Sequence, residues 1–225
     1  PPDVLARGNT AVSEFSSYLA DLIEERRKNP AKYEDDVMGR LITGSLDGDT
    51  LSDEELIQNC IFILNAGHEA TTNLIGNGVA ALFEHPDALA DLRADPTIID
   101  SAVEEFLRFE SSNQLGNRRV DTPTTVGGVE MASGTNIHLC IGAANRDPDE
   151  FDNPENLHLK RRPNRHLAFG TGVHACAGMS LARMEGRLAI GQLVERFPNL
   201  ERSGPFIRGG RVRFRGFLSY PVKAG

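Results

Sequence analysis

The sequence predicts a mainly α fold with a small β region. Apolar residues recur at helical spacing between residues 10 and 110, and one of these helical stretches opens with a capping signal. Between residues 118 and 147, β-branched residues alternate around Gly-Gly and Ser-Gly turns, which is typical of a small antiparallel sheet. At 225 residues the chain is long enough for one domain or two small ones with a sizeable core.

Three segments are predicted before the central helix. Residues 10–28 are expected to form an amphipathic surface helix, residues 33–42 a second short helix, and the Gly- and Asp-rich residues 43–50 a loop. The apolar side chains of the first helix fall on one stripe: Val12, Phe15, Leu19, Leu22 and Ile23.

A long helix is predicted from Ser52 to Glu84. Ser52 and Glu55 have the spacing of a capping box, and His85-Pro86 ends the helix. Its middle is apolar nearly all round, so we expect it in the interior. Polar side chains there would need partners, because burying them alone is costly. They are Asn65, His68, Glu69, Thr71 and Thr72.

The remaining elements follow in order along the chain. Residues 147–168 lack any period and are rich in Pro, Asn, Asp and Arg, so we expect them to be functional or tightly held. No internal repeat is present. The predicted elements are helices over 87–95 and 98–110, a small sheet over 118–147, a helix over 179–197, and short strands within 211–222.

Composition limits the possible partners. With 24 basic and 32 acidic residues the formal net charge is −8, which argues against nucleic acid. No apolar run is long enough to span a bilayer, since the longest candidate, residues 60–67, is interrupted by Asn65. Three cysteines at irregular spacing suit neither a disulfide framework nor a zinc site, and they indicate a reducing cytoplasm. The chain opens at Pro1 without methionine or a targeting signature, as a processed, truncated or partly observed sequence would.

The segment FGTGVHACAG, residues 169–178, has two possible functions. Gly170, Gly172 and Ala175 fit the G-x-G-x-x-G/A pattern of dinucleotide-binding loops, and Glu195 follows at a suitable distance. That fold requires parallel strands after the loop, and too little chain remains beyond the helix at 179–197 to supply them. We therefore consider a dinucleotide-dependent dehydrogenase the weaker alternative.

The second possible function starts from Cys176. A thiolate binds metal ions, and its negative charge is stabilised at a helix N-terminus such as the one predicted near Met179. Glycines allow the backbone to approach a flat ligand closely, and His174 adds a donor for an anionic group. These glycines are Gly170, Gly172 and Gly178. A buried inert cysteine would not need them, and Cys60 and Cys140, in an apolar helix and strand, fit that alternative better.

Three motifs together resemble one protein family. FGTGVHACAG, with LAR at 181–183, resembles the haem-binding signature of the cytochrome P-450 family of haem-thiolate monooxygenases. EFLR at 105–108 resembles the family's E-x-x-R helix, and AGHEATTN at 66–73 resembles the oxygen-binding groove of its long central helix. The motifs occur in family order, the similarity covers essentially the whole chain, and it is closest to the soluble bacterial type.

The resemblance implies a haem site and a structural network. Cys176 would be the axial ligand of the iron of haem b, iron protoporphyrin IX. The other implied haem contacts are Ala66, Arg118, Phe169, Gly170, His174 and Gly178. Glu105 and Arg108 would form a buried ion-pair network that Arg161 completes, with Arg162 as the neighbouring candidate. Taken alone, an E-x-x-R pair would be read as a weak surface ion pair.

The implied reaction inserts one oxygen atom from O2 into a small organic substrate. The family pattern on the central helix is an acid followed by an alcohol, but here Ala70 follows Glu69. Thr71, an ordered water or a substrate hydroxyl could replace the alcohol, and we expect more oxygen to be lost as peroxide unless the substrate completes this proton path. The alternative is that Ala70 merely packs. The substrate contacts implied by the resemblance are Asn65, Ala66, Ala70, Ser112, Asn113, Gln114 and Phe214.

Electrons would come from a ferredoxin or flavodoxin. The basic run KRRPNR, residues 160–165, either helps a negatively charged donor to dock or serves an internal role with its other charges solvated. Family members are considerably longer, so residues 1–225 correspond to the C-terminal part of a single haem-thiolate monooxygenase domain whose N-terminal half is absent. A catalytically incompetent fragment that serves only as a binding or structural piece therefore remains an alternative.

Overall fold

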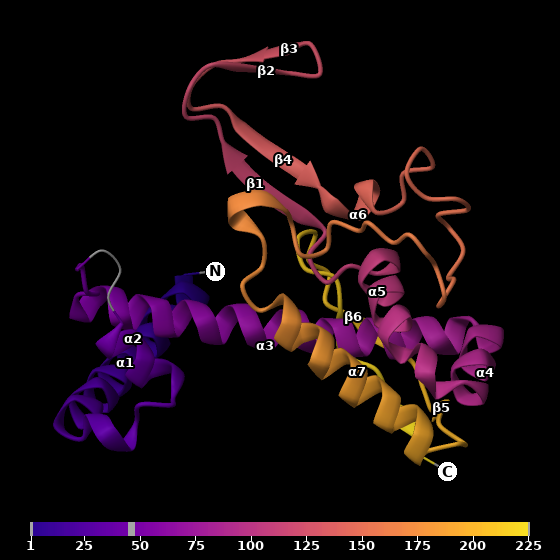
Figure 1. Cartoon of the computed structure of the whole chain (residues 1–225), viewed down its shortest axis with the longest axis horizontal. Coiled ribbons are helices and arrows are strands. Elements are labelled where there is room, and N and C mark those ends of the chain that lie inside the picture. Colours follow the sequence, from indigo (N-terminus) through magenta and orange to yellow (C-terminus); the bar gives the residue numbers. More distant parts are fainter. Residues whose placement is uncertain (1, 45–47, 225) are drawn as a thin grey trace. The chain divides into compact units, whose positions relative to one another are not determined.

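A computed structural model describes residues 2–44 and 48–224 of the chain. The chain divides into two compact parts, residues 1–68 and residues 69–225. Within the described residues the structure is mainly helical, with four small two-stranded sheets (Figure 1). The predicted fold class, mainly α with a small β region, is confirmed.

The first part is helical. It contains α1 (Pro2–Lys28), the 3-10 helix η1 (Pro30–Lys32), α2 (Val37–Thr43) and the beginning of α3 (Asp53–Glu84). α1 starts earlier than residue 10 because the chain before its apolar stripe continues the helix, with Asp3 in its first turn. The loop predicted over 43–50 includes residues 45–47, which lie outside the described residues.

Two side chains decide where the first helices begin and pack. α2 starts at Val37 rather than at residue 33 because the Asp36 side chain caps it, accepting a hydrogen bond from the Gly39 amide. Arg26 of α1 forms an ion pair with Asp36 at 2.8 Å. Leu19 and Ile23 of the predicted stripe are buried, whereas Val12 is exposed. The stripe therefore packs only in its second half.

The ends of α3 follow the predicted signals. The Glu55 amide donates to the Ser52 hydroxyl at 3.3 Å, and the Ser52 amide donates to the Glu55 carboxylate at 2.8 Å. This is the predicted capping box. The helix ends at Glu84, and α4 (Pro86–Ala94) begins with proline in its first turn.

The predicted burial of the middle of α3 is wrong. Phe62, Ile63 and Leu64 have exposed fractions of 69%, 45% and 55%. The continuously buried stretch of the helix lies farther along, at residues 77–82. A helix that is apolar all round is buried only where other elements cover each face, and the described residues do not cover these three side chains.

The second part has one hydrophobic core. Its helices after α4 are η2 (Pro96–Ile98), α5 (Ile99–Phe109), α6 (Ile141–Ala144), η3 (Gly172–His174) and α7 (Met179–Arg196). α5 packs against α7, and both contact the C-terminal half of α3. The core residues are Leu74, Ala81, Leu82, Leu92, Ile98, Ala102, Val103, Phe106, Leu107, Phe109, Leu159, Ile190 and Val194.

The small sheets are antiparallel hairpins or ladders. β1 (Leu115–Arg119) pairs with β4 (Asn136–Cys140), and the hairpin of β2 (Thr124–Val126) and β3 (Val129–Met131) continues from it (Figure 1). Gly127 and Gly128, at φ +57° and +80°, form the hairpin turn that favours glycine. The sheet predicted over 118–147 is thus confirmed, except that it begins at Leu115 and that residues 141–144 are helical.

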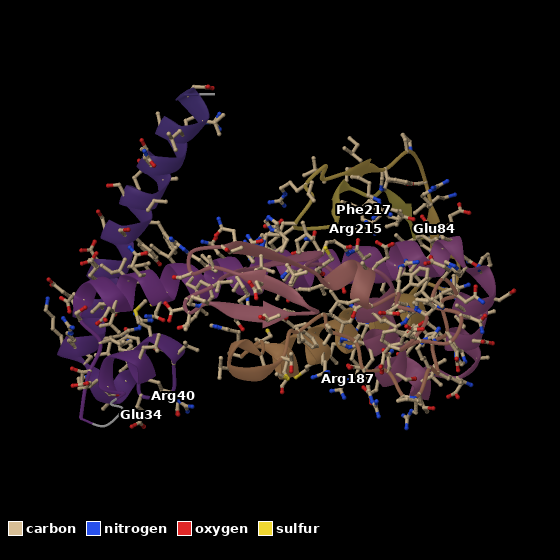
Figure 2. All side chains as sticks on the ribbon, turned by 90° about the horizontal axis from the view of Figure 1, so that it is seen from above. Glu34, Arg40, Glu84, Arg187, Arg215 and Phe217 are labelled. Atoms are coloured by element: carbon tan, nitrogen blue, oxygen red, sulfur yellow. The ribbon has the colours of Figure 1, made fainter. Side chains whose placement is uncertain are left out.

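The C-terminal segment contacts the second half of α3, where the Asn77 side chain donates to the Arg215 carbonyl at 3.0 Å and the rings of Phe83 and Tyr220 stack. β6 (Ile207–Arg208) pairs with β7 (Phe217–Ser219), and β5 (Glu201–Arg202) pairs with β8 (Val222–Lys223). Figure 2 labels Arg215 and Phe217 in this C-terminal segment and Glu84 at the end of α3. Strands were predicted only within 211–222, so β5 and β6 were missed; at two residues each they carry no readable period.

Candidate functional site

The cysteine loop, residues 169–178, holds Cys176 directly before α7. The Cys176 amide donates to the Phe169 carbonyl at 2.9 Å, which closes the loop. Gly170 and Gly172 have φ values of +66° and +69°, a left-handed conformation that favours glycine. Cys176 is half-buried, and a Cβ at Gly178 would lie 3.9 Å from its sulfur. The loop therefore presents one thiol beside a backbone surface with few side-chain atoms.

The other two cysteines differ from each other. All three cysteines are free thiols. Cys60 is partly buried, and burial raises the pKa of its thiol, as suits an inert packed cysteine. Cys140 is exposed at the end of β4, so the prediction that it is buried is wrong. Side chains alternate between the two faces of a strand, and Cys140 lies on an uncovered face.

Glu105, Arg108 and Arg161 form one ion-pair network in the interior. Two nitrogens of Arg108, on the same helix α5, each donate to a Glu105 oxygen at 2.8 Å, and Arg161 Nε lies 3.1 Å from Glu105 Oε2. Glu105 and Arg108 are 0% and 1% exposed. Arg162, the neighbouring candidate, is exposed and is not part of it.

This network holds the irregular segment 147–168 against α5. Arg108 donates to the carbonyls of Asn145, Pro154 and Asn156, and the His158 amide donates to Glu105 at 2.9 Å. The segment contains no helix or strand, as predicted, yet its backbone is fixed by buried charges. Removing one partner from such a network typically costs about 3–5 kcal/mol because the remaining charge stays buried and unpaired.

Glu104, next to Glu105, has different partners. Arg183 of α7 donates to both of its oxygens, at 2.6 and 2.9 Å, and His166 Nε2 lies 3.1 Å from Oε2. Burial opposes ionisation of this carboxyl, but the hydrogen bonds from His166 and Arg183 outweigh it and lower its pKa to about 2. Glu104 therefore carries a negative charge held by two donors from distant parts of the chain.

Phe169, the first residue of the cysteine loop, lies between those two donors. The Arg183 guanidinium lies 4.7 Å from the centre of its ring, and the His166 ring lies 5.9 Å away. Hydrogen bonds to Glu104 raise the pKa of Arg183 above its usual value, against the opposing effect of burial. Glu104 and His166 were not predicted as site residues, although the paired glutamates at 104–105 and a histidine just before the loop were visible signals.

The candidate residues on the central helix divide between the two parts of the chain. Asn65 and Ala66 belong to the first part and are exposed. In the second part, Glu69 forms an ion pair with Arg211, and the Ala70 carbonyl accepts a hydrogen bond from the Ser112 hydroxyl at 2.8 Å. Thr71 is partly buried.

The structure brings together four of the predicted substrate contacts. The Gln114 amide donates to the Arg213 carbonyl at 2.7 Å, and the Arg215 amide donates to the Ser112 carbonyl at 2.8 Å. Between them, Asn113 and Phe214 form an isolated antiparallel bridge. Residues 112–114 and 213–215 therefore form a paired surface that begins beside Ala70.

The two predicted haem-propionate contacts are exposed. Arg118 lies on β1 and donates to the Asn117 carbonyl at 2.8 Å, and His174 lies in η3 within the cysteine loop. Among the described residues neither side chain forms an ion pair, so both are available to an anionic ligand.

The basic run at 160–165 serves more than one purpose. Arg161 has the internal role described above. Lys160 lies 3.9 Å from Asp95 and Arg165 lies 3.8 Å from Glu150, both in exposed pairs, and Arg162 is exposed. Arg161 therefore has the internal role, whereas Lys160, Arg162 and Arg165 lie on the surface.

The donor set fits an iron porphyrin better than a bare metal ion. Within residues 2–44 and 48–224, no three His, Cys, Asp or Glu side chains are grouped as a metal site would require. A single thiolate can hold only a metal that brings its other ligands with it, as haem iron does. A flat ligand also suits the glycines at 170 and 172, whose side-chain-free backbone borders Cys176.

Comparison with known proteins identifies the family. The family profile of cytochrome P-450 matches residues 1–204. Biotin biosynthesis cytochrome P-450 of Bacillus subtilis is 41% identical over 196 residues, which are 87% of this chain and 49% of that protein. Cytochrome P-450 monooxygenase PikC of Streptomyces venezuelae is 38% identical over 227 residues, 99% of this chain and 54% of that protein. The chain belongs to the cytochrome P-450 family, a family of haem monooxygenases.

Solved structures agree with this assignment. P450BioI, crystallised with an acyl carrier protein bearing hexadec-9Z-enoic acid, has a TM-score of 0.93 and 38% identity, covering 100% of this chain and 57% of that one. CYP109E1 of Bacillus megaterium with testosterone has a TM-score of 0.94 and 30% identity, covering 100% and 62%. The chain spans about half the length of the curated relatives it matches.

The fold bears on the dinucleotide-binding alternative and on membrane-spanning helices. The pairings between the named strands are all antiparallel in the part of the chain that the structure describes, which excludes the dinucleotide-binding fold and its parallel sheet. None of the described helices combines the length and the apolar content that a bilayer crossing requires.

Proposed function

We propose that this chain is the C-terminal part of a single haem-thiolate monooxygenase domain, which inserts one oxygen atom from O2 into a small organic substrate. The observation that carries the proposal is Cys176, a single half-buried thiol held before α7 by a loop with two left-handed glycines. Membership of the cytochrome P-450 family supports the same reaction class.

In this proposal the cofactor is haem b and Cys176 is its axial ligand. Gly170 and Gly178 would leave room for the porphyrin and Phe169 would pack near the sulfur, while Ala66, in the first part of the chain, stays a haem contact predicted from the sequence alone. Arg118 and His174, both exposed, would donate hydrogen bonds to the propionates. Haem iron supplies the activation of dioxygen, for which side chains alone have no suitable chemistry.

Protons would reach the oxygen side through Glu69 and Thr71. Glu69 is paired with Arg211, so it must exchange this partner for water before it can carry a proton. Ala70 has no hydroxyl, and Thr71 is its partly buried neighbour. We expect peroxide formation to be raised unless Thr71, a water or a substrate hydroxyl completes the path.

The proposed substrate surface consists of residues 112–114, Phe214 and Ala70, while Asn65, in the first part of the chain, stays a contact predicted from the sequence alone. The pairing of residues 112–114 with 213–215 supports it, because it places several of these side chains on one surface beside α3. Electrons would come from a ferredoxin or flavodoxin docking on the exposed cations of the basic run, Lys160, Arg162 and Arg165. The three free thiols suit a reducing cytoplasm.

The test is Cys176→Ser in the intact protein, with Cys140→Ser as the matched control at an exposed cysteine. We expect Cys176→Ser to abolish the thiolate-type spectrum of the reduced carbon-monoxide complex, and Cys140→Ser to keep it. Spectra that are unchanged in Cys176→Ser would overturn the proposal. Product formation with a ferredoxin system distinguishes an enzyme from an incompetent fragment.

A further inference from the structure

A closed ring of contacts surrounds the start of the cysteine loop. Glu104 of α5 binds Arg183 of α7 through two hydrogen bonds and His166 through a third. His166 and Arg183 each contact the ring of Phe169, at 5.9 and 4.7 Å. The ring thus joins α5, the segment before the loop, the first loop residue and α7.

One hydrogen bond connects this ring of contacts to Cys176. The Phe169 carbonyl accepts the hydrogen bond of the Cys176 amide at 2.9 Å. Any shift of Phe169 would therefore move the backbone that presents the thiol. His166 is also fixed along the chain, because its Nδ1 lies 3.3 Å from the Ala168 amide.

This ring of contacts is more buried than an ordinary surface ion pair. The side chains of His166, Glu104 and Arg183 are 3%, 27% and 40% exposed, and Phe169 and Ala168 pack against the hydrophobic core. A second pair joins the same two helices, Arg187 with Asp100, but at 3.6 Å with 47% and 72% exposure. Figure 2 shows Arg187 at the outer surface of the molecule. Only the first pair couples to the loop.

We propose that Glu104 is a positioning residue that holds the cysteine loop in place through His166, Arg183 and Phe169. The Glu105–Arg108–Arg161 network anchors the preceding segment 147–168, whereas Glu104 acts on the loop itself. The proposal rests on the proposed function only in taking Cys176 as the haem ligand.

The experiment is hydrogen exchange, followed by mass spectrometry, on the intact haem-loaded protein. Glu104→Gln keeps the size of the side chain and removes its charge. We expect peptides covering residues 166–178 to exchange about tenfold faster in this variant, since the loop opens more often when this ring of contacts is weakened. Asp100→Asn, which removes a carboxylate from the other pair between the same helices, should change exchange there less than about twofold.

A second variant covers the case in which Glu104→Gln does not fold. Arg183→Lys keeps the positive charge but lacks the fork that binds both Glu104 oxygens, so a smaller acceleration of about threefold is expected. The reduced carbon-monoxide spectrum should shift partly away from the thiolate type in the same variants. Far-UV circular dichroism establishes that each variant is folded.

Two outcomes would overturn the inference: wild-type exchange over 166–178 in both folded variants, or an equal acceleration in Asp100→Asn. Its failure differs from failure of the proposed function. If the wild-type protein binds haem through Cys176 but Glu104→Gln and Arg183→Lys exchange like the wild type, only the positioning role of Glu104 is refuted. If Cys176→Ser leaves the spectra unchanged, the proposed function falls, whatever the exchange shows.

Discussion

At the scale of single residues, two neighbouring carboxylates have separate tasks. Glu105 is fully buried and satisfied by Arg108, Arg161 and the His158 amide. Glu104, one residue earlier, is only partly buried and binds Arg183 and His166. Successive helical residues point in directions about 100° apart, so one turn of α5 reaches both the irregular segment and the cysteine loop.

The ionisation of Glu104 predicts a difference in acid stability. Its pKa is lowered from 4.5 to about 2 in the folded chain. Because the folded pKa is depressed, the stabilisation is fully present above pH 4.5 and is lost as the pH falls towards 2. Solvent screening at this partly exposed group reduces the effect, which we place at about 1–2 kcal/mol.

The measurement is urea unfolding of the wild type and Glu104→Gln at about pH 6 and about pH 3. On acidification the variant should lose about 1 kcal/mol less free energy of unfolding than the wild type, because it has no carboxylate to protonate at this position. Asp100→Asn should behave like the wild type. Equal losses in Glu104→Gln and the wild type would contradict the pKa assignment.

At the scale of elements, close helix contacts depend on particular glycines. A Cβ at Gly78 of α3 would lie 2.7 Å from Ile190 of α7 and 3.1 Å from Phe106 of α5, both fully buried. Gly76, on the same helix, has ordinary room, with Phe217 at 3.6 Å. The packing of three helices therefore tolerates a methyl group at one position and not at the other.

These two positions give a matched prediction for stability. Gly78→Ala should lower the free energy of unfolding by about 1–2 kcal/mol, because overpacking outweighs the gain in helix propensity. Gly76→Ala should raise it by about 0.5–1 kcal/mol, since only the propensity term remains. Chemical denaturation of both variants tests the pair. A stabilising Gly78→Ala would show that Ile190 can move aside without cost.

The helices and turns were predicted well from local signals. Contacts between residues distant in sequence were predicted only in part. The capping box at Ser52, the stop at Pro86 and the turn at Gly127 depend on neighbouring residues, so they were readable. The Glu105–Arg108 pair was readable through its spacing, but Arg161 needed the resemblance as well. Glu104 binding His166 was missed, because no local pattern joins residues 104 and 166. The exposure of Phe62 was missed because apolarity alone does not say what covers a helix.

At the scale of the whole molecule, the charge distribution is uneven. The formal net charge is −8, yet Lys160, Arg162 and Arg165 lie together on the chain at its surface, in the segment just before the cysteine loop. Under the proposed function, an acidic electron donor would be repelled by the net charge of this chain and attracted by this run. Such local attraction speeds association mainly at low ionic strength, because salt screens it within about 10 Å.

The double variant Arg162→Gln/Arg165→Gln tests whether this run guides the donor. It lowers the formal net charge from −8 to −10, as does the control Arg7→Gln/Arg93→Gln, which removes two exposed arginines elsewhere. Stopped-flow reduction of the intact protein by a ferredoxin should slow about three- to tenfold at low salt in the first pair only. The difference should vanish in high salt, where the attraction is screened. If both pairs slow reduction equally, general repulsion explains the rates; if reduction is independent of ionic strength, the donor docks elsewhere.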